Sequence, residues 1–389
     1  MEQRLEFILR WAKHEASMAE LCRQFGISRK TGYYWLAYYA SGGVDGLKGH
    51  SRAPHHHPNA ISDEVTNAVV RAKVAHPSWG PKKLMPLPGE PLLITDQWPV
   101  ASTRGAILAR AGLTVQRRRR QHVPPRTRPF GSVEHPNDTW CADFKGWFRT
   151  ADGSRCEPLT ISDAHSRWLL RCQVMREGTS SELVQPLFEA TFRDYGLPLR
   201  MRTDNGPPFA SVGAGGLTEL SIWWIKLGIV PERIDPGKPS QNGRHERFHR
   251  TLKAATAQPP AATLRAQQQR FDAFQLEYNT VRPHEALGQQ PPSSCYTASP
   301  RPYPCRLEEP SYGDEAHVRR VRHNGEIRWH NGLVYINQAL VGEPVGIFET
   351  ADGWLVRYGP IDLGWVDQAR ARLRRPVKAR QASAPTPSS

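Results

Sequence analysis

The sequence predicts a multidomain protein with all-α units at its N-terminus, an α/β domain in its middle and a small all-β barrel at its C-terminus. Three observations predict this order. Capped amphipathic helical patterns fill most of the first 115 residues, β-rich runs alternate with helical ones between residues 138 and 257, and a strand–Asn331-Gly332–strand pattern lies in the last folded segment. A chain of 389 residues is also too long for one ordinary domain.

The charge of the chain favours an anionic partner. Lys and Arg outnumber Asp and Glu by 52 to 37, and the formal net charge is +15 at pH 7. An excess of this size indicates nucleic acid or another anionic surface, and a merely soluble basic enzyme is the alternative. The six cysteines form no Cys-x-x-Cys pair, which predicts free thiols in a reducing compartment.

The sequence gives no sign of a membrane partner. No apolar run approaches the roughly 18 residues of a membrane span. The first residues lack the apolar stretch of a signal peptide. We therefore expect a cytoplasmic, nucleoid-associated protein.

Residues 1–50 predict a helix-turn-helix DNA-binding domain. Ser17 and Glu20 fit the N-cap and capping-box positions of one helix. Gly26 ends that helix and Ser28 caps the next, which is the spacing of a helix-turn-helix. A helical hairpin with a basic face is the alternative. The second helix would offer these side chains to a major groove: Arg29, Lys30, Thr31, Tyr33 and Tyr34.

The next segments predict a second DNA-binding unit between two linkers. Residues 51–60 form a linker, and residues 61–115 predict a helical, winged or helix-turn-helix-like domain. After Leu84 we expect a loop or a wing at Pro86, Pro88, Gly89 and Pro91. Residues 116–137 are a basic, proline-rich linker that would also follow a phosphate backbone through Arg117, Arg118, Arg119 and Arg120.

Residues 138–257 predict an α/β catalytic core that carries three acidic candidates. Asp143 lies within an apolar strand, where a charge is costly unless it is paired or bound to metal. Asp204 closes a later strand, at the end where ligands bind in open α/β sheets, although Asp-Asn-Gly can also be a plain turn. Glu246 lies on a helix with Arg250 and Lys253 at i+4 and i+7, which suits a metal and a phosphate but also fits a surface ion-pair ladder.

The three carboxylates together predict a divalent metal site. Hard oxygen ligands favour Mg²⁺ or Mn²⁺ over zinc. Two ions about 4 Å apart could serve the attacking and leaving oxygens of a phosphodiester, so that no protein nucleophile is needed.

The last third of the chain predicts a connector, a barrel and a tail. Residues 258–315 are first helical and then proline-rich. Residues 316–368 contain a hairpin and three further strands, which predicts a small SH3-like β-barrel. Residues 369–389 are basic and then Ser- and Pro-rich, which predicts a disordered tail.

The motifs of the core resemble a known family. The strand with Asp143, Thr-Asp-Asn-Gly-Pro-Pro-Phe-Ala-Ser at 203–211 and Gln-Asn-Gly-Arg-His-Glu-Arg-Phe-His-Arg-Thr-Leu-Lys at 241–253 resemble the integrase core of DDE transposases. The likeness is to insertion-sequence transposases of the IS481 type, which are related to the IS3 group and to retroviral integrases. It extends over roughly residues 1–300 and includes Trp-Gly-Pro-Lys-Lys-Leu at 79–84 and Tyr-Asn-Thr-Val-Arg-Pro-His-Glu-Ala-Leu at 278–287.

This resemblance implies a fold, a site and a reaction. It implies an RNase H-like core in which Asp143, Asp204 and Glu246 hold Mg²⁺ or Mn²⁺, with two ions expected. It implies a transposase that binds the terminal inverted repeats of a mobile element, cleaves its ends and joins them to target DNA. Double-stranded DNA and further copies of the chain would be its partners. The residues expected to contact DNA around the acids are Asn205, Gly206, Asn242, Gly243, Arg244, Arg250 and Lys253.

Three other functions fit parts of the pattern. A decayed copy would bind DNA without cutting it, which the presence of all three acids argues against. An RNase H-type nuclease would act on RNA–DNA hybrids, whereas the helix-turn-helix favours duplex DNA. A transcription regulator would leave the core unexplained.

Overall fold

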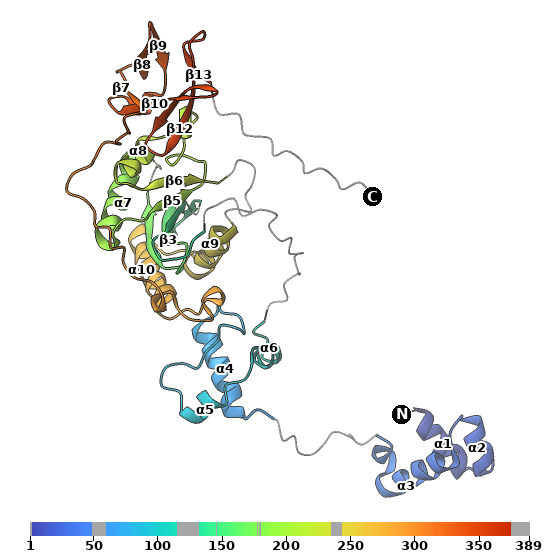
Figure 1. Cartoon of the computed structure of the whole chain (residues 1–389). Coiled ribbons are helices and arrows are strands. Elements are labelled where there is room, and N and C mark those ends of the chain that lie inside the picture. Colours follow the sequence, from blue (N-terminus) through green and yellow to red (C-terminus); the bar gives the residue numbers. More distant parts are fainter. Residues whose placement is uncertain are drawn as a thin grey trace, which may run out of the picture. The chain divides into compact units, whose positions relative to one another are not determined.

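The computed structural model describes residues 2–48, 60–114, 132–144, 146–176, 178, 180–234 and 243–374. The chain divides into two compact units, residues 1–63 and residues 64–389 (Figure 1). In the part of the chain that is described, no helix is both long and apolar enough to cross a membrane. Each of the six cysteines is a free thiol.

The N-terminal unit contains three helices, α1 (Glu2–Ala12), α2 (Met18–Gln24) and α3 (Arg29–Gly46). The caps lie where the sequence predicts them. The hydroxyl of Ser17 accepts a hydrogen bond from the Glu20 amide, and that of Ser28 accepts one from the Thr31 amide. Gly26 has a φ of +64°, which favours glycine in the turn between α2 and α3. A small core centred on Phe7, Leu21 and Cys22 holds the helices together.

Residues 60–114 form α4 (Asp63–Ala75), α5 (Leu92–Asp96) and α6 (Ala101–Arg110). The predicted loop is present at residues 86–91, and α5, which the sequence did not predict, follows it directly. Pro91 starts this helix, where its missing amide costs nothing, and its carbonyl accepts hydrogen bonds from Ile94 and Thr95. This segment contains no strand of its own, so it has no β wing.

The central domain contains a mixed β-sheet. In the sheet, β3 is antiparallel to β1 and β4, whereas β5 is parallel to β1 and β6 is parallel to β5. The spatial order is therefore β4-β3-β1-β5-β6, with the short β2 paired to the start of β3. The strands are β1 (Thr139–Phe144), β2 (Phe148–Arg149), β3 (Arg155–Asp163), β4 (Leu169–Met175), β5 (Arg200–Thr203) and β6 (Val230–Arg233).

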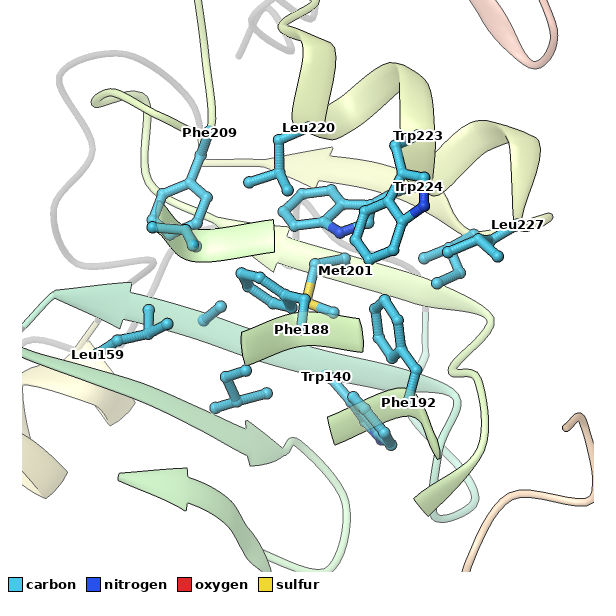
Figure 2. Packing of buried hydrophobic residues seen from close by; sticks show 14 of the residues in the cluster. Trp140, Leu159, Phe188, Phe192, Met201, Phe209, Leu220, Trp223, Trp224 and Leu227 are labelled. Atoms are coloured by element: carbon cyan, nitrogen blue, oxygen red, sulfur yellow. The ribbon is translucent and has the colours of Figure 1, made fainter. Parts of the chain in front are cut away.

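Helices cover both faces of this sheet. On one face, α7 (Ser181–Tyr195) and α8 (Glu219–Lys226) pack against β1 and β5 through an aromatic core (Figure 2). Phe188 of α7 meets Trp224 of α8 edge to face, with ring centroids 5.1 Å apart. On the other face, Leu252 of α9 (Gly243–Thr256) and Phe271 of α10 (Leu264–Thr280) pack on β3 and β4.

The C-terminal domain is a seven-stranded antiparallel sheet with one short parallel pairing, between β13 and β9. Its end strands β7 and β8 contact each other, so the sheet nearly closes into a barrel. It contains β7 (His317–Arg320), β8 (Glu326–Trp329), β9 (Gly332–Tyr335), β10 (Pro344–Thr350), β11 (Gly353–Tyr358), β12 (Ile361–Asp367) and β13 (Arg372–Arg374). Single-turn 3-10 helices lie at Ala214–Gly216, Glu285–Leu287, Pro292–Ser294 and Gln338–Leu340.

One feature of this domain differs from the sequence prediction, and a second was not predicted. Residues 372–374 form a strand although they belong to the predicted tail, so that order extends at least through Arg374. The outer side of α8 also packs into the core of the barrel through Ile222 and Ile225. The ion pair between Lys226 and Glu343, at 2.9 Å, lies at the same junction.

Candidate active site

Asp143 and Asp204 lie at the ends of neighbouring parallel strands. The register of β1 and β5 pairs Thr139 with Arg200 and Cys141 with Arg202. Continued by two residues, this register places Asp143 beside Asp204. Neighbouring strands are about 4.8 Å apart, and side chains in register point to the same face. The strand pairing therefore supports the prediction that these two carboxylates lie close together.

The backbone after Asp204 fixes the direction of its carboxylate. Its Oδ1 accepts a hydrogen bond from the Gly206 amide at 3.1 Å. The side-chain amide of Asn205 donates to the Ile234 carbonyl at 2.7 Å, which ties this loop to the end of β6. A Cβ atom at Gly206 would lie 3.2 Å from Oδ2 of Asp204, so a larger residue would press on the carboxylate.

Helix α9 is attached to the sheet by two buried histidines. His249 is 7% exposed, and its Nε2 is hydrogen-bonded to the Thr160 hydroxyl of β3 at 2.9 Å. His245 is 6% exposed, and its Nε2 lies 3.5 Å from the Ser162 hydroxyl of the same strand. At i and i+4 the two rings stack on one side of the helix, with centroids 5.5 Å apart.

His249 also brings α9 to Asp143. Its Nδ1 lies 3.8 Å from Oδ2 of Asp143. The Thr160 hydroxyl donates a hydrogen bond to the Asp143 backbone carbonyl at 3.1 Å. Asp143, Thr160 and His249 thus form one connected group across β1, β3 and α9.

Glu246, Arg250 and Lys253 occupy the exposed side of α9. Glu246 comes directly after His245, and Arg250 directly after His249. Each is therefore rotated by about a quarter turn around the helix axis from a buried histidine. The three side chains lie at i, i+4 and i+7, as the sequence predicts, and point away from the sheet core rather than into it.

The buried histidine next to Glu246 carries no charge at neutral pH. Burial, helped by the charge of Arg202, lowers the pKa of His245 to about 4. His245 is therefore neutral at physiological pH and adds no positive charge beside the acids. Within the described residues, no group of three or more His, Cys, Asp or Glu side chains is arranged to hold a metal ion. The donors that lie near one another are carboxylate oxygens at strand ends, and these fit Mg²⁺ or Mn²⁺ chemically.

The other predicted DNA contacts fall into two groups. On α3, Arg29, Lys30, Tyr33 and Tyr34 are exposed, while the Thr31 hydroxyl is hydrogen-bonded to Ser28. In the core, Gly243 begins α9 and Arg244 follows it. Five predicted residues lie outside the described residues: Arg117, Arg118, Arg119, Arg120 and Asn242.

Sequence reasoning missed the residues that position the helix. His245 and His249 stood within the motif at 241–253 without an assigned role, and Thr160 and Ser162 were assigned none. Their spacing was the available signal, because two histidines at i and i+4 mark one side of a helix. Asp163, at the end of β3, accepts hydrogen bonds from the backbone amides of Asn137 and Ser166 at 2.8 and 2.7 Å, in addition to the Ser166 hydroxyl.

Family models match the two segments that the motifs occupy. A helix-turn-helix domain matches residues 3–55. An integrase core domain matches residues 133–239, and a second model with this description matches residues 227–292. The chain contains an integrase core domain. This domain includes Asp143, Asp204 and Glu246.

Proteins of bacterial insertion elements are similar to the chain that carries this integrase core. An uncharacterized 39.2 kDa protein of insertion element IS476 from Xanthomonas euvesicatoria is 32% identical over 186 residues, which cover 47% of this chain and 51% of that protein. An uncharacterized 31.7 kDa protein of insertion element IS407 from Burkholderia multivorans is 31% identical over 185 residues, which cover 47% of this chain and 64% of that protein. The chain thus spans between half and two thirds of the length of these relatives.

Solved retroviral integrase structures are similar at lower identity. The simian T-cell lymphotropic virus intasome in complex with PP2A regulatory subunit B56 gamma is 19% identical with a TM-score of 0.32, over 58% of this chain and 76% of that one. The HTLV-2 integrase catalytic core domain in complex with magnesium is 16% identical with a TM-score of 0.32, over 42% and 98%.

Proposed function

We propose that this protein is the DDE transposase of an insertion sequence, of the IS481 type. The observation that supports the proposal is the register of β1 and β5, which, continued by two residues, aligns Asp143 with Asp204 in a chain with an integrase core domain and insertion-element relatives. Two adjacent carboxylates at strand ends are an unfavourable arrangement unless a cation compensates them.

Asp143, Asp204 and Glu246 would hold two Mg²⁺ or Mn²⁺ ions. Bound ions would activate the attacking oxygen and stabilise the leaving oxygen of a phosphodiester. The chain itself orients the ligands, because the Gly206 amide directs Asp204 and His249 fixes α9 against Asp143. Arg250 and Lys253, exposed beyond Glu246, would hold the DNA backbone near the acids.

The exposed side of α3 would bind the terminal inverted repeats of the element. Arg29, Lys30, Tyr33 and Tyr34 form a continuous basic and aromatic stripe there, and the Lys30 ammonium lies 5.9 Å from the Tyr34 ring centroid. Joining two ends requires two active sites on one DNA assembly, so the working form would be a dimer or a larger symmetric oligomer.

The test is strand transfer of a labelled element end into plasmid DNA. We expect products with Mg²⁺ and none with EDTA. The Asp204→Asn variant should lose the products while it binds the labelled end as the unchanged protein does. Asp194→Asn, which removes an exposed carboxylate of α7, is the matched control and should keep full activity. Products from Asp204→Asn at the unchanged rate would refute the site, and products in EDTA would refute the metal.

A further inference from the structure

Trp147 is a large aromatic residue at the surface of the integrase core. It lies between β1 and β2 and is 56% exposed. The guanidinium carbons of Arg149 and Arg155 lie 5.8 and 5.3 Å from the centroid of its ring. Exposed aromatic rings next to cations bind single-stranded nucleic acid, because bases stack on the ring and phosphates pair with the cations.

The two arginines are placed in a way that favours an anion. Arg149 and Arg155 are direct register partners across β2 and β3. Like charges at such positions are destabilising. Glu157 pairs with Arg155 at 2.9 Å. Arg149 donates to the Gly153 carbonyl, and no described residue forms an ion pair with it. One positive charge at this edge of the sheet is therefore left over.

A cavity of about 90 Å³ opens beside Trp147. Phe148 and Pro158 line it from the sheet, and Leu252 and Lys253 line it from α9. A single water needs only about 10–15 Å³, so this space has room for a group larger than one solvent molecule. It is too small for a stacked base pair.

Lys253 connects the cavity to the acids. It lies seven residues after Glu246 on α9, which is about 10 Å along the helix axis. Its side chain is exposed at the cavity, and none of the described carboxylates forms an ion pair with it. The cavity thus lies within a few nucleotides of any phosphodiester held at Glu246.

We propose that Trp147, Arg149, Arg155 and the cavity beside Lys253 bind one unpaired nucleotide of the DNA strand. The base enters the cavity against Trp147, and its phosphate lies against Arg149 and Lys253. A base within the double helix cannot reach such a cavity, so the site selects a strand end that has left its partner. This inference rests on the proposed function, because it takes DNA as the substrate of the neighbouring acids.

Equilibrium binding in EDTA tests this site without any requirement for catalysis. The probes are a fluorescein-labelled duplex with three mismatched terminal pairs and the same duplex fully paired, and the readout is anisotropy with the full-length protein. The unchanged protein should bind the mismatched end more tightly. Trp147→Ala should weaken that binding roughly ten-fold, the loss expected for one stacked base. Binding of the paired duplex should stay the same, and Trp147→Phe should restore most of the loss.

Arg149→Gln and Arg193→Gln provide the matched pair of charge variants. Arg193 also lies over an aromatic ring, that of Tyr303 at 4.6 Å, but on α7 and away from the cavity. Arg149→Gln should weaken binding of the mismatched end, and Arg193→Gln should not. The inference would be overturned if Trp147→Ala bound each probe as tightly as the unchanged protein does. It would also be overturned if the variant lost the same affinity for the mismatched and the paired duplex.

The two proposals fail in different experiments. If no strand transfer occurs in Mg²⁺ but Trp147→Ala still weakens binding of the mismatched end, the transposase proposal is refuted and the nucleotide site stands. Strand transfer in Mg²⁺ with no Trp147 effect on binding would refute the nucleotide site alone.

Discussion

Nδ1 of His249 lies 3.8 Å from Oδ2 of Asp143, so the helix that carries Glu246 touches the strand that carries the first acid. The other nitrogen of the same ring is hydrogen-bonded to Thr160 at 2.9 Å. A single buried side chain therefore joins α9 to β1 and β3. His249 is not one of the three acids. The distance between Glu246 and Asp143 nevertheless depends on it, because its ring holds α9 against β1.

Replacing His249 should therefore reduce strand transfer more than DNA binding. In His249→Ala the Thr160 hydroxyl loses a buried partner, which costs on the order of 1–3 kcal/mol. The helix would then move relative to Asp143, and we expect strand transfer to fall at least ten-fold while end binding changes little. Both can be measured with the same labelled end, and thermal unfolding reports the stability loss.

Two further variants separate position from stability. His249→Gln can still donate to Thr160 and should recover part of the activity. Ala254→Ser, at an exposed position of the same helix, should change neither quantity. If His249→Ala lost stability but transferred strands at the unchanged rate, His249 would have no role in placing Glu246.

The acids could be predicted from the sequence because each stands in a local pattern. Asp143 and Asp204 follow apolar runs that read as strands, and Glu246 shares a helical side with two cations. The role of the histidines could not, because their i and i+4 spacing marks one side of a helix without showing what that side packs against. His249 meets a residue 89 positions away and His245 one that is 83 positions away. The two histidines are buried only because α9 packs on β3.

The fold shows the same limit at two elements. Pro86, Pro88 and Pro91 predicted the loop that the structure contains, but no local pattern predicted α5, which begins at Leu92 with Pro91 as its N-cap. Residues 372–374 carry arginines, which suggested a solvated tail, yet β13 pairs with β12 from Trp365–Arg374 to Asp367–Arg372. The backbone of β13 is hydrogen-bonded by β12. The residues of β13 alone do not show that this partner strand exists.

Acid should destabilise the protein through His245. The unfolded imidazole has a pKa of 6.5, and burial lowers the folded pKa to about 4. Between these values the unfolded state binds more protons, so stability falls as the pH drops from 6.5 to 4. The loss is complete below pH 4 and on the order of 3 kcal/mol. Urea unfolding from pH 7.5 to 4 measures it.

The His245→Gln variant should flatten this pH dependence. His284 contributes a second slope over the same range, since burial beside Lys83 and Arg282 lowers its pKa to about 3. The variant should therefore keep part of the acid sensitivity and lose the remainder only when His284→Gln is added. An unchanged slope in His245→Gln would contradict the assignment.

Removing the charge of Lys83 should stabilise the protein at neutral pH. Burial, and then the charge of Arg282, lowers the pKa of Lys83 from 10.5 to about 8, while Glu285 opposes this effect. Below pH 8 the Lys83 side chain is charged in both the folded and the unfolded state. The folded state is then destabilised by the full free energy of burying this charge. Between pH 8 and 10.5 the unfolded state binds more protons, so stability rises with pH and the cost disappears.

The Lys83→Met variant should therefore melt at a higher temperature than the unchanged protein at pH 7. The difference should shrink as the pH rises from 8 to 10.5. Lys82→Met is the matched control, since Lys82 is exposed and pairs with Glu285 at 3.0 Å. It should bring no gain. A lower melting temperature for Lys83→Met at pH 7 would show that Lys83 has a favourable partner.

The exposed stripe on α3 should determine the salt dependence of end binding. Arg29 has no structural task in the cap, which Ser28 and Thr31 form between themselves. If Arg29 contacts a phosphate, Arg29→Ala should weaken binding of the inverted repeat and lower the slope of log K against log salt by about 1. Lys13→Ala, at an exposed position next to α1, removes the same charge and should leave the slope unchanged. A variant that lacks one phosphate contact releases one counterion fewer on binding, which lowers the slope. Equal slopes for both variants and the unchanged protein would therefore place the DNA on another surface of the N-terminal unit.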